Sequence, residues 1–260
     1  MAGKHAHLPN MSQPRKTRLE KPLATAASII AFTFTCRLSI FTQNSLGLFT
    51  FSEPLFMLSA LLLGPIPGML VGGIGFTLSN FLLGYPHYII ASSMANASAG
   101  FLIGKFNQTK QPHQLIGIAS TMILIFLSTL IGTTIYVGQV YIGFTKKLFM
   151  GEEVMKAGGL YAYRLYVPPW FWITFAALTA TISILTSLRK SPKHLWATTS
   201  LLVGCMTITT VFFLYEVILI PTLFNIKVDA ATNIIINLGH SIISATIAAI
   251  TYWLIKWFSR

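Results

Sequence analysis

Residues 53–105 read EPLFMLSALLLGPIPGMLVGGIGFTLSNFLLGYPHYIIASSMANASAGFLIGK, and this stretch decides the fold. Between residues 54 and 104 it contains no Lys, Arg, Asp or Glu. Proline and glycine divide it into three pieces, 53–64, 65–84 and 87–104. Each piece is predicted to be a helix in lipid, because only a helix satisfies all of its own backbone polar groups there.

The first of these pieces is too short to cross a bilayer. It has about a dozen residues, which makes roughly 18 Å of helix at 1.5 Å per residue, against a hydrocarbon core of about 30 Å. The polar segment before it, TQNSLGLFTFSE at 42–53, is therefore expected to dip into the membrane. Non-helical backbone is tolerated at that depth where it is buried in protein or lines a wet cavity.

Glycines recur every four residues in this stretch, at Gly64, Gly68 and Gly72 and again at Gly100 and Gly104. Small residues four apart allow two helices to approach closely in lipid. The pattern predicts tight helix–helix packing.

Three motifs carry a family resemblance: LLLGPIPGMLVGGIG at 61–75, LSNFLLGYP at 78–86 and AGFLIGK at 99–105. Together they resemble the substrate-binding (S) components of energy-coupling-factor (ECF) vitamin transporters, most closely the riboflavin and hydroxymethylpyrimidine type. The resemblance covers 53–105 well, the first helix and the last two weakly, and the middle of the chain not at all. It implies a subunit that binds a small water-soluble vitamin and delivers it with a coupling membrane subunit and ATPase subunits.

Composition independently indicates an integral membrane protein. The 260 residues are 54% hydrophobic and 9% charged, with a mean hydropathy of +0.69, which is typical of a polytopic all-α bundle in the lipid bilayer. The net charge of +12 does not indicate a nucleic-acid partner, since the basic residues lie at segment ends. Cys36 and Cys205 sit in apolar runs and suggest neither a disulfide framework nor a metal site.

The apolar segments divide the chain into eight predicted helices. A disordered, basic cytoplasmic tail is expected over 1–21, followed by a single transmembrane domain over 22–260. Its six-helix core resembles an S component, and the block 114–188 is interpreted as an inserted helical hairpin. Outside 53–105 the predicted helices cover 22–42, 115–137, 168–188, 195–220 and 231–258.

Lys and Arg are in excess in the amino-terminal tail and in the loops on the same side of the membrane. This bias predicts a multi-pass protein of the cell membrane with both termini in the cytoplasm. The connection 139–167 then lies outside. It is either a lid or an interfacial loop, with Trp170 and Trp172 as anchors at the headgroup level.

Ala27 and Ala31 form a small-residue face on the first helix. Such a face lets another helix approach closely. The resemblance implies that this partner is the coupling subunit, and internal packing is the alternative.

A set of polar residues shares one depth in the outer half of the predicted membrane domain. Asn233, Asn237, His240, Ser241 and Ser244 fall within one stripe of the last helix. Intramembrane polar and ionisable groups are functional candidates, because each must face protein or water. The predicted substrate-binding residues are Arg37, Glu53, Asn96, Glu216, Asn233, Asn237 and His240, with Tyr85 and His87 at the same depth.

Each candidate also has a structural alternative. Arg37 either extends to the interface or pairs with Glu216, and Glu53 could cap the short helix, because a carboxylate is favourable at a helix start. His240 alone could be a hydrogen-bonded core residue.

The resemblance implies a substrate in the outer half, between the first extracellular loop and the last three helices. Segments 214–216 and 237–240 resemble the family there, with His240 where glutamine is commoner. Asn96 stands where many relatives carry lysine, so a fixed positive charge is missing and an uncharged or heteroaromatic vitamin would suit the amides. The positive charge of Arg37 would also suit a ligand that carries a carboxylate or a phosphate.

The sequence contains no catalytic or nucleotide-binding signature, and no cofactor is expected. An enzyme is therefore disfavoured, and ATP hydrolysis is assigned to partner chains. Two rivals remain: a self-sufficient secondary transporter, and a membrane-embedded enzyme that uses Glu216, His240 and Arg37.

Overall fold

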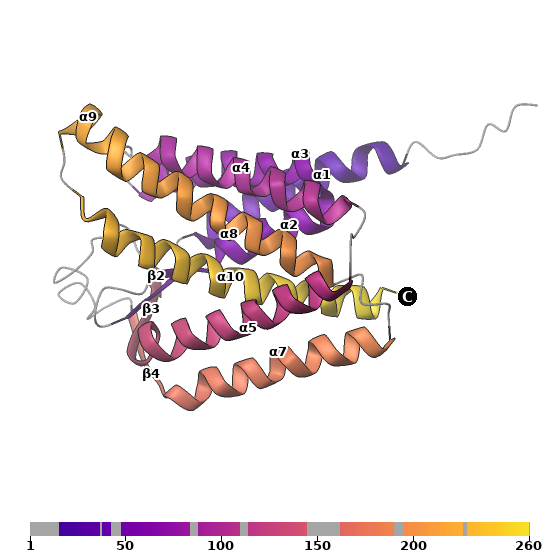
Figure 1. Ribbon diagram of the computed structural model, residues 1–260. Helices are drawn as coiled ribbons and strands as arrows, with labels where there is room; N and C mark the ends of the chain where they lie inside the picture. Colours follow the sequence, from indigo (N-terminus) through magenta and orange to yellow (C-terminus); the bar gives the residue numbers. More distant parts are fainter. Residues whose placement is uncertain are drawn as a thin grey trace, which may run out of the picture.

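The computed structural model is a helical bundle with a small β-sheet at one end (Figure 1). It describes residues 16–36, 38–42, 48–83, 88–109, 114–144, 162–189, 195–225 and 228–259. The long helices run side by side, and the carboxyl terminus lies at the end of the bundle opposite the sheet (Figure 1). The helices are α1 (Lys16–Thr35), α2 (Ser52–Leu63), α3 (Pro65–Leu83), α4 (Ile89–Gln108), α5 (Gln114–Ile135), α7 (Pro169–Arg189), α8 (Trp196–Leu214), the π-helix η3 (Tyr215–Leu219), α9 (Ile220–Phe224) and α10 (Ala230–Phe258).

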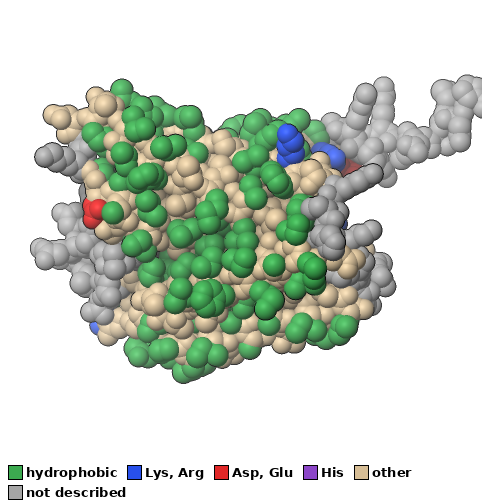
Figure 2. Space-filling model, viewed as in Figure 1, with side chains coloured by type: hydrophobic (Ala, Val, Ile, Leu, Met, Phe, Trp, Pro, Cys, Tyr) green, Lys and Arg blue, Asp and Glu red, His purple; other side chains and the backbone are tan. Residues whose placement is uncertain are grey.

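The described helices confirm a polytopic membrane bundle. Five spans are long and apolar enough to cross a membrane: Pro65–Leu82, Gln114–Ile135, Pro169–Leu188, Trp196–Phe224 and Ala230–Phe258. In the space-filling view, apolar side chains are spread over the visible face, and the few charged side chains in view lie toward its two ends (Figure 2). Such a surface suits lipid, since hydrocarbon offers no partner to a charge.

The first helix differs from its predicted limits at both ends. It begins at Lys16, inside the expected disordered tail, and ends at Thr35 rather than at residue 42. The last residues of the predicted helix, Leu38–Thr42, form strand β1 instead. Hydrophobicity alone does not distinguish the two states for a short apolar run, and here a neighbouring strand supplies the partner.

The sheet joins the segment before α2 to the hairpin block. Its strands β1, β2 (Leu48–Thr50), β3 (Gly138–Phe144) and β4 (Ala162–Val167) lie in the order β2-β1-β3-β4, with antiparallel neighbours. Ile40 in β1 pairs with Phe49 on one side and with Ile142 on the other. The connection predicted over 139–167 as a lid or an interfacial loop is therefore strand at both of its described ends.

The two tryptophans at the start of α7 have different surroundings. Trp170 is 64% exposed, as expected for an interfacial anchor. Trp172 is buried, and its indole N–H donates to the backbone oxygen of Tyr136 at 2.9 Å. The anchoring role predicted for Trp172 is wrong, because this side chain packs between α5 and α7.

Helices α3 and α4 pack backbone against backbone, which confirms the prediction from the glycine spacing. A Cβ added at Gly100 would lie 2.2 Å from the backbone oxygen of Gly68, and one at Gly68 would lie 2.6 Å from that of Gly100. One at Gly104 would lie 2.4 Å from the carbonyl carbon of Gly64. No side chain fits between the two helices at these positions.

Replacing Gly100 with alanine should push α3 and α4 apart. Forcing an extra methyl into a packed contact costs about 1 to 3 kcal/mol, which outweighs the gain of about 1 kcal/mol in helix propensity. We expect a lower unfolding temperature, which is measured by the tryptophan fluorescence of the detergent-purified protein. Gly73→Ala is the control, since its nearest neighbour would be the Ala97 Cβ at 3.2 Å. Equal unfolding temperatures for the two variants would contradict the packing argument.

Candidate functional site

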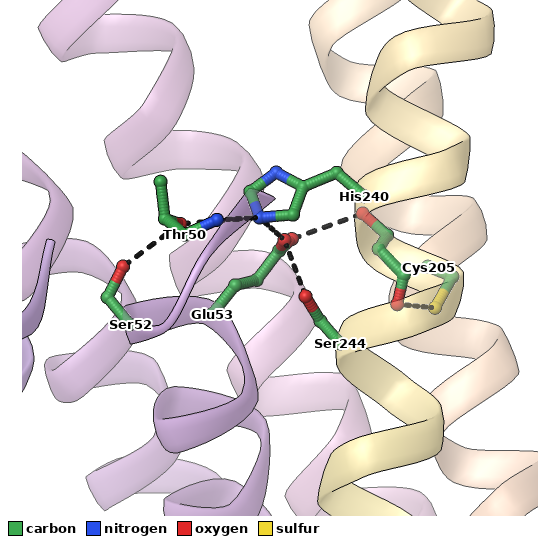
Figure 3. A network of polar contacts seen from close by, with 7 residues as sticks. Thr50, Ser52, Glu53, Cys205, His240 and Ser244 are labelled. Carbon is green, nitrogen blue, oxygen red and sulfur yellow. Dashed lines mark hydrogen bonds and ion pairs between the residues drawn. The ribbon is translucent and has the colours of Figure 1, made fainter. Parts of the chain in front are cut away.

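Glu53 lies in the first turn of α2 with its side chain directed at α10 (Figure 3). It is 3% exposed. The Ser241 hydroxyl donates to Glu53 Oε1 and the Ser244 hydroxyl to Oε2, both at 3.1 Å. The two serines can share this carboxylate because residues three apart lie on the same face of a helix.

His240 completes this cluster from the same helix. Its Nε2 lies 2.8 Å from Glu53 Oε2, and the Thr50 backbone nitrogen lies 3.0 Å from the same Nε2 (Figure 3). The Ser52 hydroxyl donates in turn to Thr50 Oγ1 at 3.2 Å. An imidazole nitrogen either donates or accepts one hydrogen bond, so His240 Nε2 cannot donate to Glu53 and accept from Thr50 N–H at the same time.

This cluster ties the junction of β2 and α2 to the middle of α10. The residue that caps α2 is Phe51, and the hydrogen bonds of the Glu53 carboxylate go to α10. Glu53 is therefore an inter-helix contact and not merely a helix cap. A buried carboxylate is stable only when it is paired and hydrogen-bonded, and α10 supplies both.

A second buried carboxylate lies at the junction of α8 and η3. Glu216 is 3% exposed, and its Oε1 accepts a hydrogen bond from the Tyr88 hydroxyl at 3.4 Å. The Asn233 side chain lies close to the Glu216 carboxylate. The other oxygen, Oε2, has no partner among the described residues. Single π-turns inside helices are frequent at functional sites, and this one holds a half-satisfied carboxylate.

The first turn of α10 is held by Asp229, which precedes Asn233 by four residues. The backbone nitrogen of Thr232 donates to Asp229 Oδ1 at 3.3 Å. A hydrogen bond from the Thr232 side chain, together with one from its backbone, lowers the pKa of the Asp229 carboxyl. This charged cap fixes the end of the helix that presents Asn233.

Asn237 lies on α10 between the residues of the two clusters, four positions after Asn233 and three before His240. Its side chain is partly exposed. The structure thus brings five predicted site residues to the sheet end of the bundle: Glu53, Glu216, Asn233, Asn237 and His240.

Asn96 stands apart from these five in its contacts. It is 1% exposed on α4, its amide nitrogen donates to Ser92 O of its own helix at 2.9 Å, and its Oδ1 has no partner among the described residues. Its backbone oxygen faces Gly72 of α3. Arg37, Tyr85 and His87 lie outside the described residues, and so does the suggested Arg37–Glu216 pair.

Sequence reasoning missed two contributors. Thr50 was overlooked because no strand was expected before α2, and Tyr88 because only its neighbours Tyr85 and His87 were considered. The apolar alternation of LFTF at 48–51 is a weak strand signal that could have indicated Thr50.

The described residues offer no group of three His, Cys, Asp or Glu that could hold a metal ion. Cys36 and Cys205 are both buried; the Cys36 thiol donates to Thr33 O at 2.9 Å, and the Cys205 thiol donates to Ser241 O at 3.2 Å. The site therefore consists of hydroxyls, amides, one imidazole and two carboxylates.

The buried polar end of this bundle can be compared with known families. The family model described as ECF-type riboflavin transporter, S component, matches residues 22–162, more than half of the chain. The chain belongs to this family. Comparison with curated proteins and with solved structures finds no match.

Family membership makes this chain a multi-pass membrane transport protein, the substrate-binding subunit of an ECF transporter. The family is one of transporters and not of enzymes. The match covers Glu53 and Asn96, whereas Glu216 and all of α10 lie beyond it. The contacts of Glu53 with α10 therefore link the matched part of the chain to the rest.

Replacing His240 with alanine should destabilise the protein by about 1 to 3 kcal/mol, because the change removes a polar partner of the buried Glu53 carboxylate and of the Thr50 backbone N–H. In the double variant with Glu53→Gln the loss should be smaller than the sum of the two single losses. Denaturant unfolding of the purified protein measures all three.

Thr181→Ala on α7 is the control for these variants, because the Thr181 side chain is exposed and its hydroxyl bonds Ala177 O of its own helix. Strict additivity of the two single losses would show that Glu53 and His240 do not stabilise each other.

Proposed function

We propose that this S component binds riboflavin or a closely similar vitamin at the sheet end of the bundle. The site lies between the β2–α2 junction, Glu216 and the first turns of α10. We further propose that it passes the vitamin to a coupling membrane subunit driven by ATPase subunits. The observation that carries the proposal is Glu216, a buried carboxylate near Asn233 with one oxygen that has no hydrogen-bond partner among the described residues, in a chain of this family.

The chemistry of riboflavin suits these groups. The molecule is uncharged and heteroaromatic, and it carries an imide N–H and a row of hydroxyls as hydrogen-bond donors. Glu216 Oε2 can accept one such donor, and Asn233 and Asn237 can both donate and accept. The rings of Tyr88 and Tyr215, with centroids 6.4 Å apart, add an aromatic wall.

The orientation proposed for this subunit places the sheet end outside and both termini in the cytoplasm. Lys21 near the start of α1, Lys105 near the end of α4 and Lys256 near the end of α10 all belong to the opposite end of the bundle (Figure 1). An excess of basic residues marks the cytoplasmic side. A vitamin would then enter from the outer face.

Riboflavin titration of the purified protein, followed by quenching of the vitamin's fluorescence, tests the site. A buried group that loses its hydrogen-bond partner costs about 1 to 3 kcal/mol. Glu216→Ala and Asn237→Leu should therefore weaken binding about tenfold or more. Gln114→Leu is the control for Asn237→Leu, because Gln114 is an exposed amide at the start of α5, at the other end of the bundle.

Two results would count against this site. Equal affinities for wild type and both site variants, with all of them folded, would mean that the polar stripe is structural and the vitamin binds elsewhere. Absence of binding by the wild type would reject riboflavin itself.

The coupling role is tested separately on α1. Ala27 and Ala31 are both exposed in this structure, so their face is open to a partner helix. The double variant Ala27→Leu, Ala31→Leu should abolish ATP-driven riboflavin uptake into proteoliposomes that contain the coupling and ATPase subunits, while riboflavin affinity stays unchanged.

Ala177→Leu, on the exposed face of α7, is the matched control for the alanine pair. Normal uptake by the double variant would refute the coupling role. Uptake into vesicles that lack the ATPases would favour a self-sufficient carrier instead.

A further inference from the structure

A cavity of about 240 Å³ lies between the sheet, helices α7 and α10, and Tyr136 just after α5. The sheet contributes Ile40, Phe49 and Leu165, while α7 contributes Trp172 and α10 contributes Ile247. It is larger than the engineered cavity of about 150 Å³ that binds benzene, and smaller than the pockets of about 300 to 1,000 Å³ that enclose whole drug-sized ligands. Its size suits part of an apolar molecule.

The walls of this cavity are almost entirely carbon. The described residues around it include no charged side chain, and the indole N–H of Trp172 is already bonded to Tyr136 O. Apolar cavities of this kind stay dry. A polar vitamin placed here would lose the hydrogen bonds it makes with water and gain few in return.

The mouth of the cavity opens on the outside of the bundle. Its most exposed lining side chains are Leu165 and Tyr166 on β4, at 53% and 66%, and Phe171 in the first turn of α7, at 44%. Strand β4 is an edge of the sheet, and α7 lies on the outside of the bundle (Figure 1). Further along α7 the surface continues with exposed Ile173 and Leu178, so lipid tails meet the mouth directly.

The residues next to the mouth mark the headgroup level of the membrane. Tyr163 is 83% exposed and Trp170 is 64% exposed, and tyrosine and tryptophan concentrate at the membrane–water boundary. Between them in sequence, Arg164 is exposed, with its guanidinium 5.6 Å from the centre of the Tyr141 ring. A cation at this level attracts an anionic lipid headgroup.

We propose that this cavity binds one acyl chain of a phospholipid from the leaflet at the sheet end, with the lipid phosphate beside Arg164. A hydrocarbon chain is the apolar ligand present at this surface, and filling the cavity restores the van der Waals contacts that an empty void lacks. The mouth and the α7 wall are built from residues beyond the segment 22–162 that the family shares. The cavity borders the proposed vitamin site at Phe49 and Phe51 of the β2–α2 junction, but Glu216, Asn233 and Asn237 do not line it.

The full chain, purified in detergent, is incubated with phosphatidylglycerol, and retained lipid is counted by native mass spectrometry. A second phosphatidylglycerol, with a photoreactive group on its acyl chain, maps the contact. We expect one tightly retained lipid and cross-links to β4 and to the first two turns of α7. Cross-links confined to other surfaces would overturn the proposal.

Two variants fill the cavity: Ile247→Phe on α10 and Leu165→Trp on the edge strand, where exposure makes the change easier to accommodate. Each should reduce lipid retention about tenfold or more. Ile184→Phe is the matched control, because Ile184 is 59% exposed on α7 and does not line the cavity. Arg164→Gln should reduce retention several-fold, and unchanged retention would refute the headgroup contact.

Equal retention in the filling variants and the control would overturn the acyl-chain site. So would loss of riboflavin binding in a filling variant that keeps its lipid, since the cavity would then belong to the vitamin. Riboflavin titration of the same variants separates the two sites, because a failure of the vitamin proposal leaves the lipid counts unaffected.

Discussion

Every backbone polar group inside a membrane must find a partner within the protein, and this constraint shapes the whole bundle. Helix α2 has 12 residues and cannot cross the hydrocarbon core by itself, and the described chain before it is strand. The sheet supplies the missing hydrogen bonds, since β1 pairs on both sides with β2 and β3. The start of α2 is in turn fastened to α10 by Glu53.

The features that depend on local spacing were predictable from the sequence. Gly64 and Pro65 mark the boundary between α2 and α3, and the glycine spacing predicted the α3–α4 contact. The polar stripe on α10 predicted the face that meets the rest of the protein, where Ser241 and Ser244 are buried. These signals are local: a Gly-Pro boundary and spacings of three or four residues along one helix.

What the sequence did not predict depends on partners far apart in the chain. Leu38–Thr42 has the sequence of the end of an apolar helix. It forms a strand because β3, about a hundred residues later, supplies its backbone hydrogen-bond partners. The sequence allowed Glu53 to be a helix cap and His240 to be a core histidine. It did not indicate that the two side chains contact each other and join α2 to α10. The π-turn that presents Glu216 has no marker in the local sequence, which continues as an ordinary apolar run.

The order of strands in the sheet also sets a sequence of events during synthesis. Strand β1 emerges early, but its central partner β3 follows only after α2, α3, α4 and α5 have been made. Contacts between distant segments form late, because the intervening chain must be ordered first. The sheet can therefore close only after α2 to α5 have been made, and it is among the last elements to form.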